Sequence, residues 1–232
     1  MKKDKIARAR SGKQKVLLVD DHPVVREGLA ERINRERDLV VCGEAQNARE
    51  ALRAVASLQP DIVILDLSLP KGHGLELVKD LRTLHPDLRV VVFSMHDESV
   101  FAERALRAGA HGYVMKQEPP ERLLVAIRTV LRGDYFISER ASSTCLQAFF
   151  SRSTKAVTHS VARLSDRELE IFQLIGQGVS TRKIADRLGR SVKTIETHRT
   201  RIKEKLAVKS AAELVHRATC WVESDRGTLD AR

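Results

Sequence analysis

The 232-residue chain has few cysteines and no long apolar run, and each of these shortages excludes a class of protein. Its cysteines, Cys42, Cys145 and Cys220, are odd in number, far apart and without a CxxC pair, so neither a disulfide framework nor a zinc site is expected. No apolar run approaches the ~18–20 residues of a spanning helix, and the basic N-terminus is not followed by the apolar core of a secretory signal. We therefore predict a reducing, cytoplasmic location and no membrane partner.

What the composition does contain is a surplus of basic residues. Charged residues make up 31% of the chain, and the formal net charge is +10. Such a balance favours an anionic partner such as nucleic acid, although charge alone does not identify that partner. Part of the surplus lies in residues 1–14, for which a disordered, solubilising tail is the simplest interpretation.

Residues 15–136 alternate between short apolar runs and helical patterns. Continuous apolar runs of this length are typical of buried parallel strands, and Cys42 in the second run is predicted to belong to the core. Five strand–helix repeats indicate a parallel sheet with helices on both faces. The predicted strands cover residues 15–20, 39–43, 61–66, 89–94 and 112–116, and the predicted helices cover 25–33, 48–58, 74–84, 100–108 and 119–132.

Three carboxylates are predicted to meet at one edge of this sheet. Asp20 and Asp21 end the first strand and Asp66 ends the third, and these strands are neighbours in a sheet of order 2-1-3-4-5. A single Asp at a strand end is usually a turn residue, but converging carboxylates repel one another unless a cation lies among them. Mg²⁺ suits such oxygen ligands, and a carboxylate beside it can accept a phosphoryl group.

Two further strand ends carry matching chemistry. Ser94 ends the fourth strand with a hydroxyl group, and Lys116 ends the fifth strand with a cation. A hydroxyl, an ammonium group and a metal ion around one carboxylate would form a cradle for a transferred phosphoryl group.

The second half of the chain has no strand pattern. Serines and threonines over residues 137–162 indicate a polar linker, in which Leu146, Phe149 and Phe150 could form a short helix. Ser165 with Glu168 has the spacing of a helix-capping box. Residues 163–222 are predicted to form a small all-α four-helix domain before a C-terminal tail at 223–232, with helices over residues 166–175, 181–188, 192–206 and 211–221.

Residues 181–206 have the spacing of a helix-turn-helix. On the longer helix, an apolar face is expected to pack inward, and the opposite face mixes charged and hydroxyl residues that can meet bases and phosphates. From helical spacing alone, an ordinary solvated amphipathic helix is the simpler interpretation. The residues predicted to pack inward are Val192, Ile195, Ile202 and Leu206.

Four short sequence motifs in residues 15–136 resemble those of a known protein family. VDDH at 19–22, ILDLSLP at 64–70, VFS at 92–94 and GYVMK at 112–116 resemble the receiver domain of two-component signalling. The resemblance implies a flavodoxin-like doubly wound (βα)5 fold and a sensor histidine kinase as partner. It implies Asp66 as phospho-acceptor, Ser94 and Tyr113 as a switch pair and Lys116 as a phosphate contact. The implied Mg²⁺ ligands are Asp20, Asp21, Asp66 and the backbone carbonyl of Ser68.

The C-terminal motifs are LSDRELE at 164–170, IGQGVS at 175–180 and SVKTIETH at 191–198. They resemble the LuxR-type DNA-binding domains of the NarL/FixJ regulators, which implies a dimer on double-stranded DNA with helix 192–206 in the major groove. His198 is expected either near the DNA backbone or packed against the preceding helix. The expected DNA-binding residues are Lys193, Thr194, Glu196, Thr197, His198, Thr200, Arg201 and Lys205.

The function predicted from the whole sequence is a phosphorylation-controlled transcription regulator, not an enzyme with an external substrate. Phosphorylation is expected to promote a homodimer, with RNA polymerase as a further partner. The unphosphorylated chain is expected to be monomeric or held shut, with the receiver covering the DNA-reading helix. Two alternative functions fit the sequence less well. An aspartyl-phosphate hydrolase often has a second Asp where Ser68 stands, and a relay or scaffold protein would not need the basic C-terminal domain.

Overall fold

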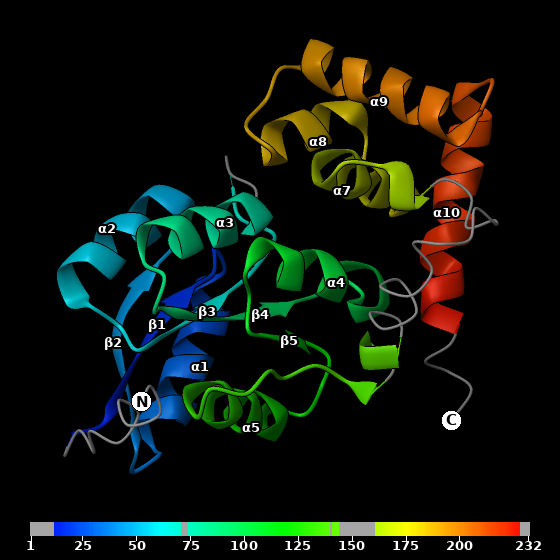
Figure 1. Cartoon of the computed structure of the whole chain (residues 1–232). Coiled ribbons are helices and arrows are strands. Elements are labelled where there is room, and N and C mark those ends of the chain that lie inside the picture. The colour runs from blue at the N-terminus through cyan, green and yellow to red at the C-terminus, as the bar shows by residue number, and fades with distance from the viewer. Residues whose placement is uncertain (1–11, 71–73, 140, 144–160, 228–232) are drawn as a thin grey trace, which may run out of the picture.

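Five parallel strands form the centre of the N-terminal domain in the computed structural model, which describes residues 12–70, 74–139, 141–143 and 161–227 (Figure 1). Their order, β2-β1-β3-β4-β5, is the order predicted from the sequence. Consecutive strands are neighbours in this order except β2 and β3, which lie on either side of β1, where the direction of winding reverses. The strands are β1 (Gln14–Val19), β2 (Leu39–Ala45), β3 (Ile62–Leu65), β4 (Arg89–Ser94) and β5 (Gly112–Met115).

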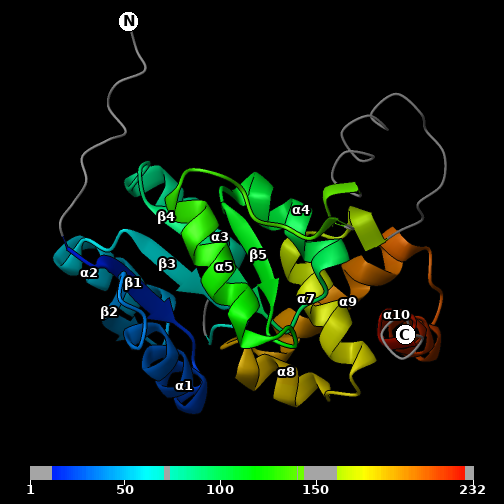
Figure 2. The ribbon, with the colours of Figure 1, turned by 90° about the horizontal axis from the view of Figure 1, so that it is seen from below.

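Helices cover both faces of the sheet, as the continuous apolar strands require. Alternate side chains of a strand point to opposite faces, so Val16 and Leu18 belong to one apolar cluster while Leu17 and Val19 belong to another. Helices α1 and α5 lie on one face and α2, α3 and α4 on the other (Figure 1 and Figure 2). Their bounds are α1 Pro23–Asn34, α2 Ala48–Leu58, α3 Gly74–Leu84, α4 Glu98–Ala108 and α5 Pro120–Leu131.

One core assignment holds only in part. Cys42 packs against the apolar core but is only partly buried, because β2 is the outer strand of the sheet and has fewer neighbours. Residues beyond α5 continue to contact the N-terminal domain. Ser138 N donates to Glu98 Oε1 at 2.8 Å, and Ala141 is buried. The region predicted as linker therefore begins with residues that contact the N-terminal domain. Leu146, Phe149 and Phe150 lie outside the described residues.

The C-terminal domain contains four α-helices in the described part of the chain: α7 (Asp166–Gly176), α8 (Thr181–Arg187), α9 (Val192–Leu206) and α10 (Ala211–Gly227). The predicted capping box is confirmed at Ser165 and Glu168, and Ser191 caps α9. Helix α10 ends at Gly227 rather than near Trp221. None of the described helices is long and apolar enough to cross a bilayer.

The inward face of α9 is confirmed except at its first residue. Ile195 and Ile202 are buried completely, and Leu206 is 2% exposed, whereas Val192 is 45% exposed. Val192 directly follows the capping residue Ser191, and the packing of α9 on α7 and α8 begins one turn later. The apolar repeat therefore predicted the buried face of α9 correctly, but the predicted face began one turn too early.

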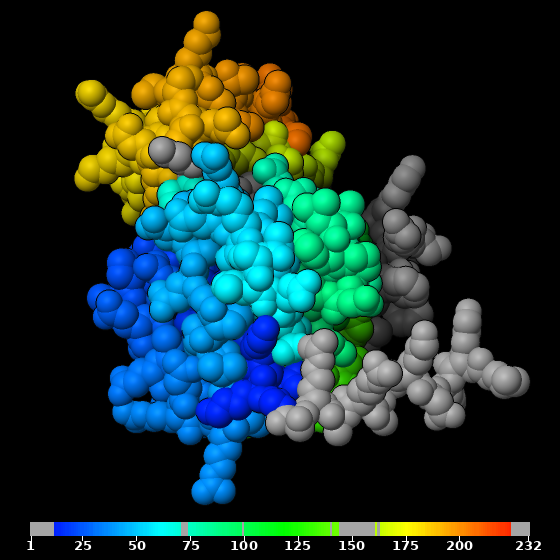
Figure 3. Space-filling view, turned by 90° about the vertical axis from the view of Figure 1, so that its left-hand side faces the viewer, coloured from blue at the N-terminus to red at the C-terminus, as the bar shows by residue number. Residues whose placement is uncertain are grey.

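The C-terminal domain lies directly against the N-terminal domain (Figure 3), and polar contacts join the two at α7. Arg104 Nη1 on α4 donates to Leu164 O at 3.0 Å and to Asp166 Oδ1 at 2.8 Å, and Lys79 on α3 lies 3.3 Å from Asp166 Oδ2. One cluster of buried apolar side chains contains residues of both domains. Helix α9 lies on the far side of the C-terminal domain (Figure 1), so the expectation that the receiver covers it is wrong for this structure.

Close packing of α7 on α10 leads to a stability prediction. A Cβ on Gly176 would collide with the carbonyl oxygen of Ala218, so Gly176→Ala should lower the free energy of unfolding by about 1–3 kcal/mol. Gly28 in α1 is the matched control, because no atom lies within 4 Å of its added Cβ. Gly28→Ala should be neutral or stabilise by up to ~1 kcal/mol. Urea unfolding followed by circular dichroism measures both, and an unchanged midpoint for Gly176→Ala would contradict the packing described.

Candidate functional site

The predicted acidic cluster is present where β1 and β3 end. These strands pair in parallel with Val19 opposite Leu65, so the next residues along each chain segment, Asp20 and Asp66, come side by side. The Asp66 N–H extends this ladder by donating to Val19 O at 2.9 Å. One ligand atom from each of four residues lies within 4.8 Å of the others, and these residues are Asp20, Asp21, His22 and Asp66.

Lys116 joins the cluster from β5, two strands away from β3. Its Nζ lies 2.6 Å from Asp20 Oδ2 and 2.7 Å from Asp66 Oδ2. Burial by itself would lower the pKa of Lys116, but the charges and hydrogen bonds of the two carboxylates outweigh it and raise the pKa above its ordinary value. The ammonium group therefore stays charged and holds Asp20 and Asp66 together.

Asp66 receives donors on both carboxylate oxygens. Oδ1 accepts from Ser94 Oγ at 2.8 Å and from Ser68 N at 3.1 Å, while Oδ2 faces Lys116. The side chain is only 2% exposed. A carboxylate held among a hydroxyl, an amide N–H and an ammonium group can act as a nucleophile, and the same donors can receive the oxygens of an added phosphoryl group.

The carboxylates of the cluster fit a divalent cation. Three carboxylates and one ammonium group leave two negative charges at this edge. The buried Oδ1 of Asp21 accepts no hydrogen bond. His22 Nδ1 lies only 2.8 Å away, but a short distance without the right angles does not make a hydrogen bond. Hard oxygen ligands with an excess of negative charge are the donors that Mg²⁺ prefers. His22 was not among the residues predicted for this site, although its place in the sequence directly after Asp20 and Asp21 was a visible signal.

The predicted switch pair, Ser94 and Tyr113, meets through the backbone of a third residue. His96 N–H lies 3.5 Å from Ser94 Oγ, and His96 O accepts from the Tyr113 hydroxyl at 2.9 Å. Tyr113 is 1% exposed, and its burial raises the pKa of the phenol well above the ordinary value, so the hydroxyl remains a donor. No sequence motif pointed to His96, because its role depends on the backbone beyond β4.

The polar face of α9 is open to solvent. Thr194 and His198 are half-buried, and Thr194 Oγ1 lies 2.8 Å from the capping hydroxyl of Ser191. The buried Nδ1 of His198 has no hydrogen-bond partner among the described residues, and desolvation lowers the pKa of this imidazole. These features match the packing interpretation of His198. The predicted DNA-binding residues that are exposed are Lys193, Glu196, Thr197, Thr200 and Arg201.

Two cations of α9 already have partners inside the domain. Lys205 Nζ lies 2.6 Å from Glu168 Oε2. Burial by itself would raise the pKa of the Glu168 carboxyl, but Lys205 and the Ser165 N–H outweigh this effect, so the pKa lies below its ordinary value. Arg199, which the helical pattern did not single out, donates to Thr181 Oγ1 at 2.7 Å and joins α9 to α8. Its spacing of four from Ile195 on the buried face was the signal that could have revealed it.

Comparison with known proteins agrees with this geometry. The family model "Response regulator receiver domain" matches residues 16–128, and "Bacterial regulatory proteins, luxR family" matches residues 162–218. The chain is 38% identical over 208 residues to the oxygen regulatory protein NreC of Staphylococcus aureus, a match that covers 88% of this chain and 96% of that protein. The chain therefore belongs to the NarL/FixJ family of DNA-binding two-component response regulators.

Solved structures are similar over one or both domains. RcsB from Salmonella enterica serovar Typhimurium, bound to promoter rprA in the presence of phosphomimetic BeF3⁻, is 26% identical, with a TM-score of 0.62. That match covers 90% of this chain and 99% of the RcsB chain. A LuxR-family response regulator from Aurantimonas sp. SI85-9A1 is 37% identical over 60% of this chain and 99% of its own, with a TM-score of 0.56.

The charge balance of the cluster leads to a metal-binding prediction. Asp21→Asn should weaken Mg²⁺ binding by about tenfold or more, because it removes an anionic oxygen that has no other strong partner. Glu27→Gln on α1 removes the same charge outside the cluster and should leave the affinity within about twofold. Calorimetric titration of the full chain with Mg²⁺ makes the comparison. Equal affinities for the two variants would contradict Asp21 as a ligand.

Proposed function

We propose that phosphoryl transfer from a histidine kinase to Asp66 controls DNA binding by this chain. The observation that carries the proposal is the convergence of Ser94 Oγ, Ser68 N and Lys116 Nζ on one buried carboxylate. An Asp66 oxygen attacks phosphorus, an O–P bond forms, and the P–N bond to the kinase histidine breaks with its electron pair leaving on the imidazole. Mg²⁺ held by Asp20, Asp21, Asp66 and the Ser68 carbonyl would neutralise charge on the phosphoryl oxygens.

The residues around Asp66 then exchange partners. Lys116 moves from the carboxylate toward a phosphoryl oxygen, and the Ser94 hydroxyl turns to donate to another. Since His96 lies between Ser94 and Tyr113, movement of Ser94 changes the backbone that holds the Tyr113 hydroxyl. The result is a population shift between two packings of the face formed by α4, β5 and α5. An aspartyl-phosphate hydrolase often has a second carboxylate at the position of Ser68. We therefore propose no hydrolysis of an external substrate.

Labelling tests the phospho-acceptor. A small phosphodonor such as acetyl phosphate with Mg²⁺ should add the mass of one phosphoryl group to the full chain, and Asp66→Asn should abolish the addition because the nucleophilic oxygen is lost. Asp87→Asn, an exposed carboxylate before β4 at the opposite edge of the sheet, is the matched control and should label like the wild type. Intact-mass spectrometry decides between the variants; undiminished labelling of Asp66→Asn would refute the assignment.

On double-stranded DNA, the chain would act as a homodimer with α9 of each copy in the major groove and half-sites about one helical turn apart. Support comes from the exposed face of α9 and from the similarity to RcsB, whose dimers were seen bound to DNA. Lys193 and Arg201 would contact phosphates, whereas Lys205 would first have to leave Glu168. RNA polymerase is a further proposed partner, because the regulated process is transcription.

Base recognition is assigned to Glu196, Thr197 and Thr200. Thr197 Oγ1 donates to Lys193 O at 3.0 Å and Thr200 Oγ1 donates to Glu196 O at 3.1 Å. With their hydroxyl hydrogens used within the helix, both threonines would offer DNA a methyl group and a hydroxyl acceptor. Glu196 would accept from a cytosine amino group, the base-edge donor that suits a carboxylate.

Binding-site selection separates these roles. Lys193→Ala should weaken binding to all sequences and reduce the salt slope by about one, because one phosphate contact is lost. Glu196→Ala should relax the preference at one base pair, by about 1–3 kcal/mol of discrimination. Lys13→Ala, which removes an exposed lysine of the receiver, is the charge control and should leave both properties unchanged. Unaltered base preferences for Glu196→Ala would show that Glu196 is a solvated residue.

A further inference from the structure

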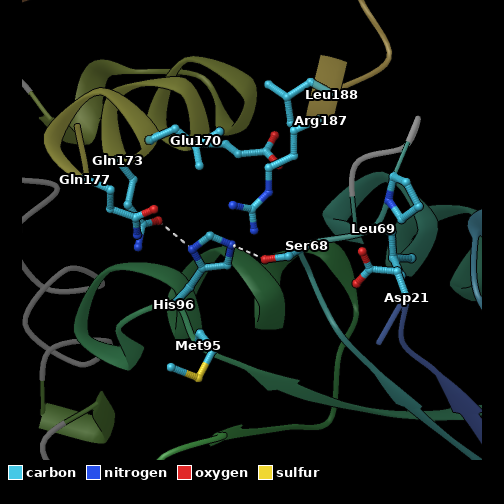
Figure 4. Close-up of a pocket in the computed structure, with 12 residues that line it drawn as sticks. Asp21, Ser68, Leu69, Met95, His96, Glu170, Gln173, Gln177, Arg187 and Leu188 are labelled. Atoms are coloured by element: carbon cyan, nitrogen blue, oxygen red, sulfur yellow. Dashed lines mark hydrogen bonds between the residues drawn. The ribbon is translucent and has the colours of Figure 1, made fainter. Parts of the chain in front are cut away.

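The DNA-binding domain reaches the rim of the phosphorylation pocket through His96. The imidazole Nε2 lies 3.1 Å from Ser68 Oγ, and Nδ1 meets Gln173 Oε1 of α7 (Figure 4). The ring also stacks on Phe101 with centroids 4.5 Å apart, which fixes its orientation. Ser68 N in turn donates to Asp66. The His96 imidazole therefore connects Ser68, the neighbour of Asp66, to Gln173 in the DNA-binding domain.

A second contact keeps the domain in this place. Asp166 at the start of α7 pairs with Arg104 and Lys79, and Arg104 is only 18% exposed. Burial would raise the pKa of the Asp166 carboxyl, but the hydrogen bond and charge of Arg104, together with Lys79, outweigh it and lower the pKa. Two separated polar contacts, at His96 and at Arg104, therefore set the position of α7 and of α8 behind it.

A cavity of about 80 Å³ remains between the docked domains. Its receiver wall includes Asp21 and Ser68, and its opposite wall includes Gln173 and Arg187. A space of this size is large enough for a few water molecules or for a phosphoryl group. Asp66 does not line the cavity, but both Asp21 and Ser68 adjoin its carboxylate, and a phosphoryl group on Asp66 would project beyond the strand ends beside them. The cavity is thus the region toward which such a group would extend.

Arg187 points into this cavity from the last turn of α8 (Figure 4). Its guanidinium makes no hydrogen bond or ion pair to any residue in the described part of the chain. Glu170 also lines the cavity, but Arg167 already lies 2.7 Å from that carboxylate. An unpaired guanidinium facing an edge with excess negative charge is well suited to bind phosphate, because its N–H groups match the geometry of phosphate oxygens.

We propose that Arg187 contacts the phosphoryl group on Asp66, so that the DNA-binding domain recognises the phosphorylated state of its own receiver directly. This inference rests on the proposed role of Asp66 as phospho-acceptor. The ligand is an aspartyl phosphate, and Arg187 is its second side-chain cation beside Lys116. The docked arrangement of the two domains is consequently more stable after phosphorylation than before it.

Beryllium trifluoride with Mg²⁺, a mimic of the phosphoryl group, tests the proposal on the full chain. Arg187→Gln should weaken BeF3⁻ binding by about three- to tenfold in calorimetric titration, as expected for loss of one charge-assisted contact in a partly solvated site. Arg182→Gln is the matched control, because Arg182 is exposed on the same helix and does not line the cavity. ¹⁹F NMR adds a local readout: the resonances of bound BeF3⁻ should shift in Arg187→Gln and not in Arg182→Gln.

The outcomes separate this inference from the function on which it rests. If Asp66→Asn binds BeF3⁻ as well as the wild type does, the phospho-acceptor assignment fails. If Asp66 is required but Arg187→Gln and Arg182→Gln both match the wild type within about twofold, only the inference is overturned. Equal weakening in both variants, or a loss confined to DNA affinity, also overturns it. Such results would assign Arg187 to general electrostatics or to the DNA backbone.

Discussion

Mutual repulsion among Asp20, Asp21 and Asp66 is the constraint on which the rest of the molecule depends. The parallel register of β1 and β3 forces these carboxylates together, and Lys116 from β5 compensates only part of their charge. The remaining negative charge gives this edge the hard oxygen ligands that suit a divalent cation. Ser94 and Lys116 contact this cluster directly, and Tyr113 is connected to it through His96 and Ser94.

The same edge of the sheet is where the two domains meet. In an α/β sheet, the carboxyl ends of the strands carry the loops that are free to vary, so the residues that respond to a ligand lie beside those available for docking. His96 belongs to both groups, because its backbone lies between Ser94 and Tyr113 and its ring lies between Ser68 and Gln173. Helix α9 is left uncovered by this docking. In the function proposed above, control of DNA binding would therefore act through α7 and α8 rather than by covering the DNA-reading face.

Much of the fold was predictable because it depends on local, periodic signals. The strand order, the bounds of α2 and α3 and the Ser165 capping box follow from apolar patterning and from short-range capping chemistry. The errors occurred where burial depends on the neighbouring element. Val192 has the apolar character of the α9 core but lies beyond its packing, and Cys42 lies on an outer strand. A residue's own pattern does not reveal how far its partner helix or strand extends.

By itself, the sequence determined the architecture, the three carboxylates, Ser94 and Lys116, because strand ends are marked by where apolar runs stop. It also determined the helix-turn-helix and its polar face. Only the tertiary structure decided that Lys205 is paired with Glu168, that His96 bridges the domains and that Arg187 faces the cavity lined by Asp21 and Ser68. These contacts join residues far apart in the chain and, for His96 and Arg187, in different domains. Their geometry follows from how two separately folded units pack, and no periodic pattern within either unit encodes it.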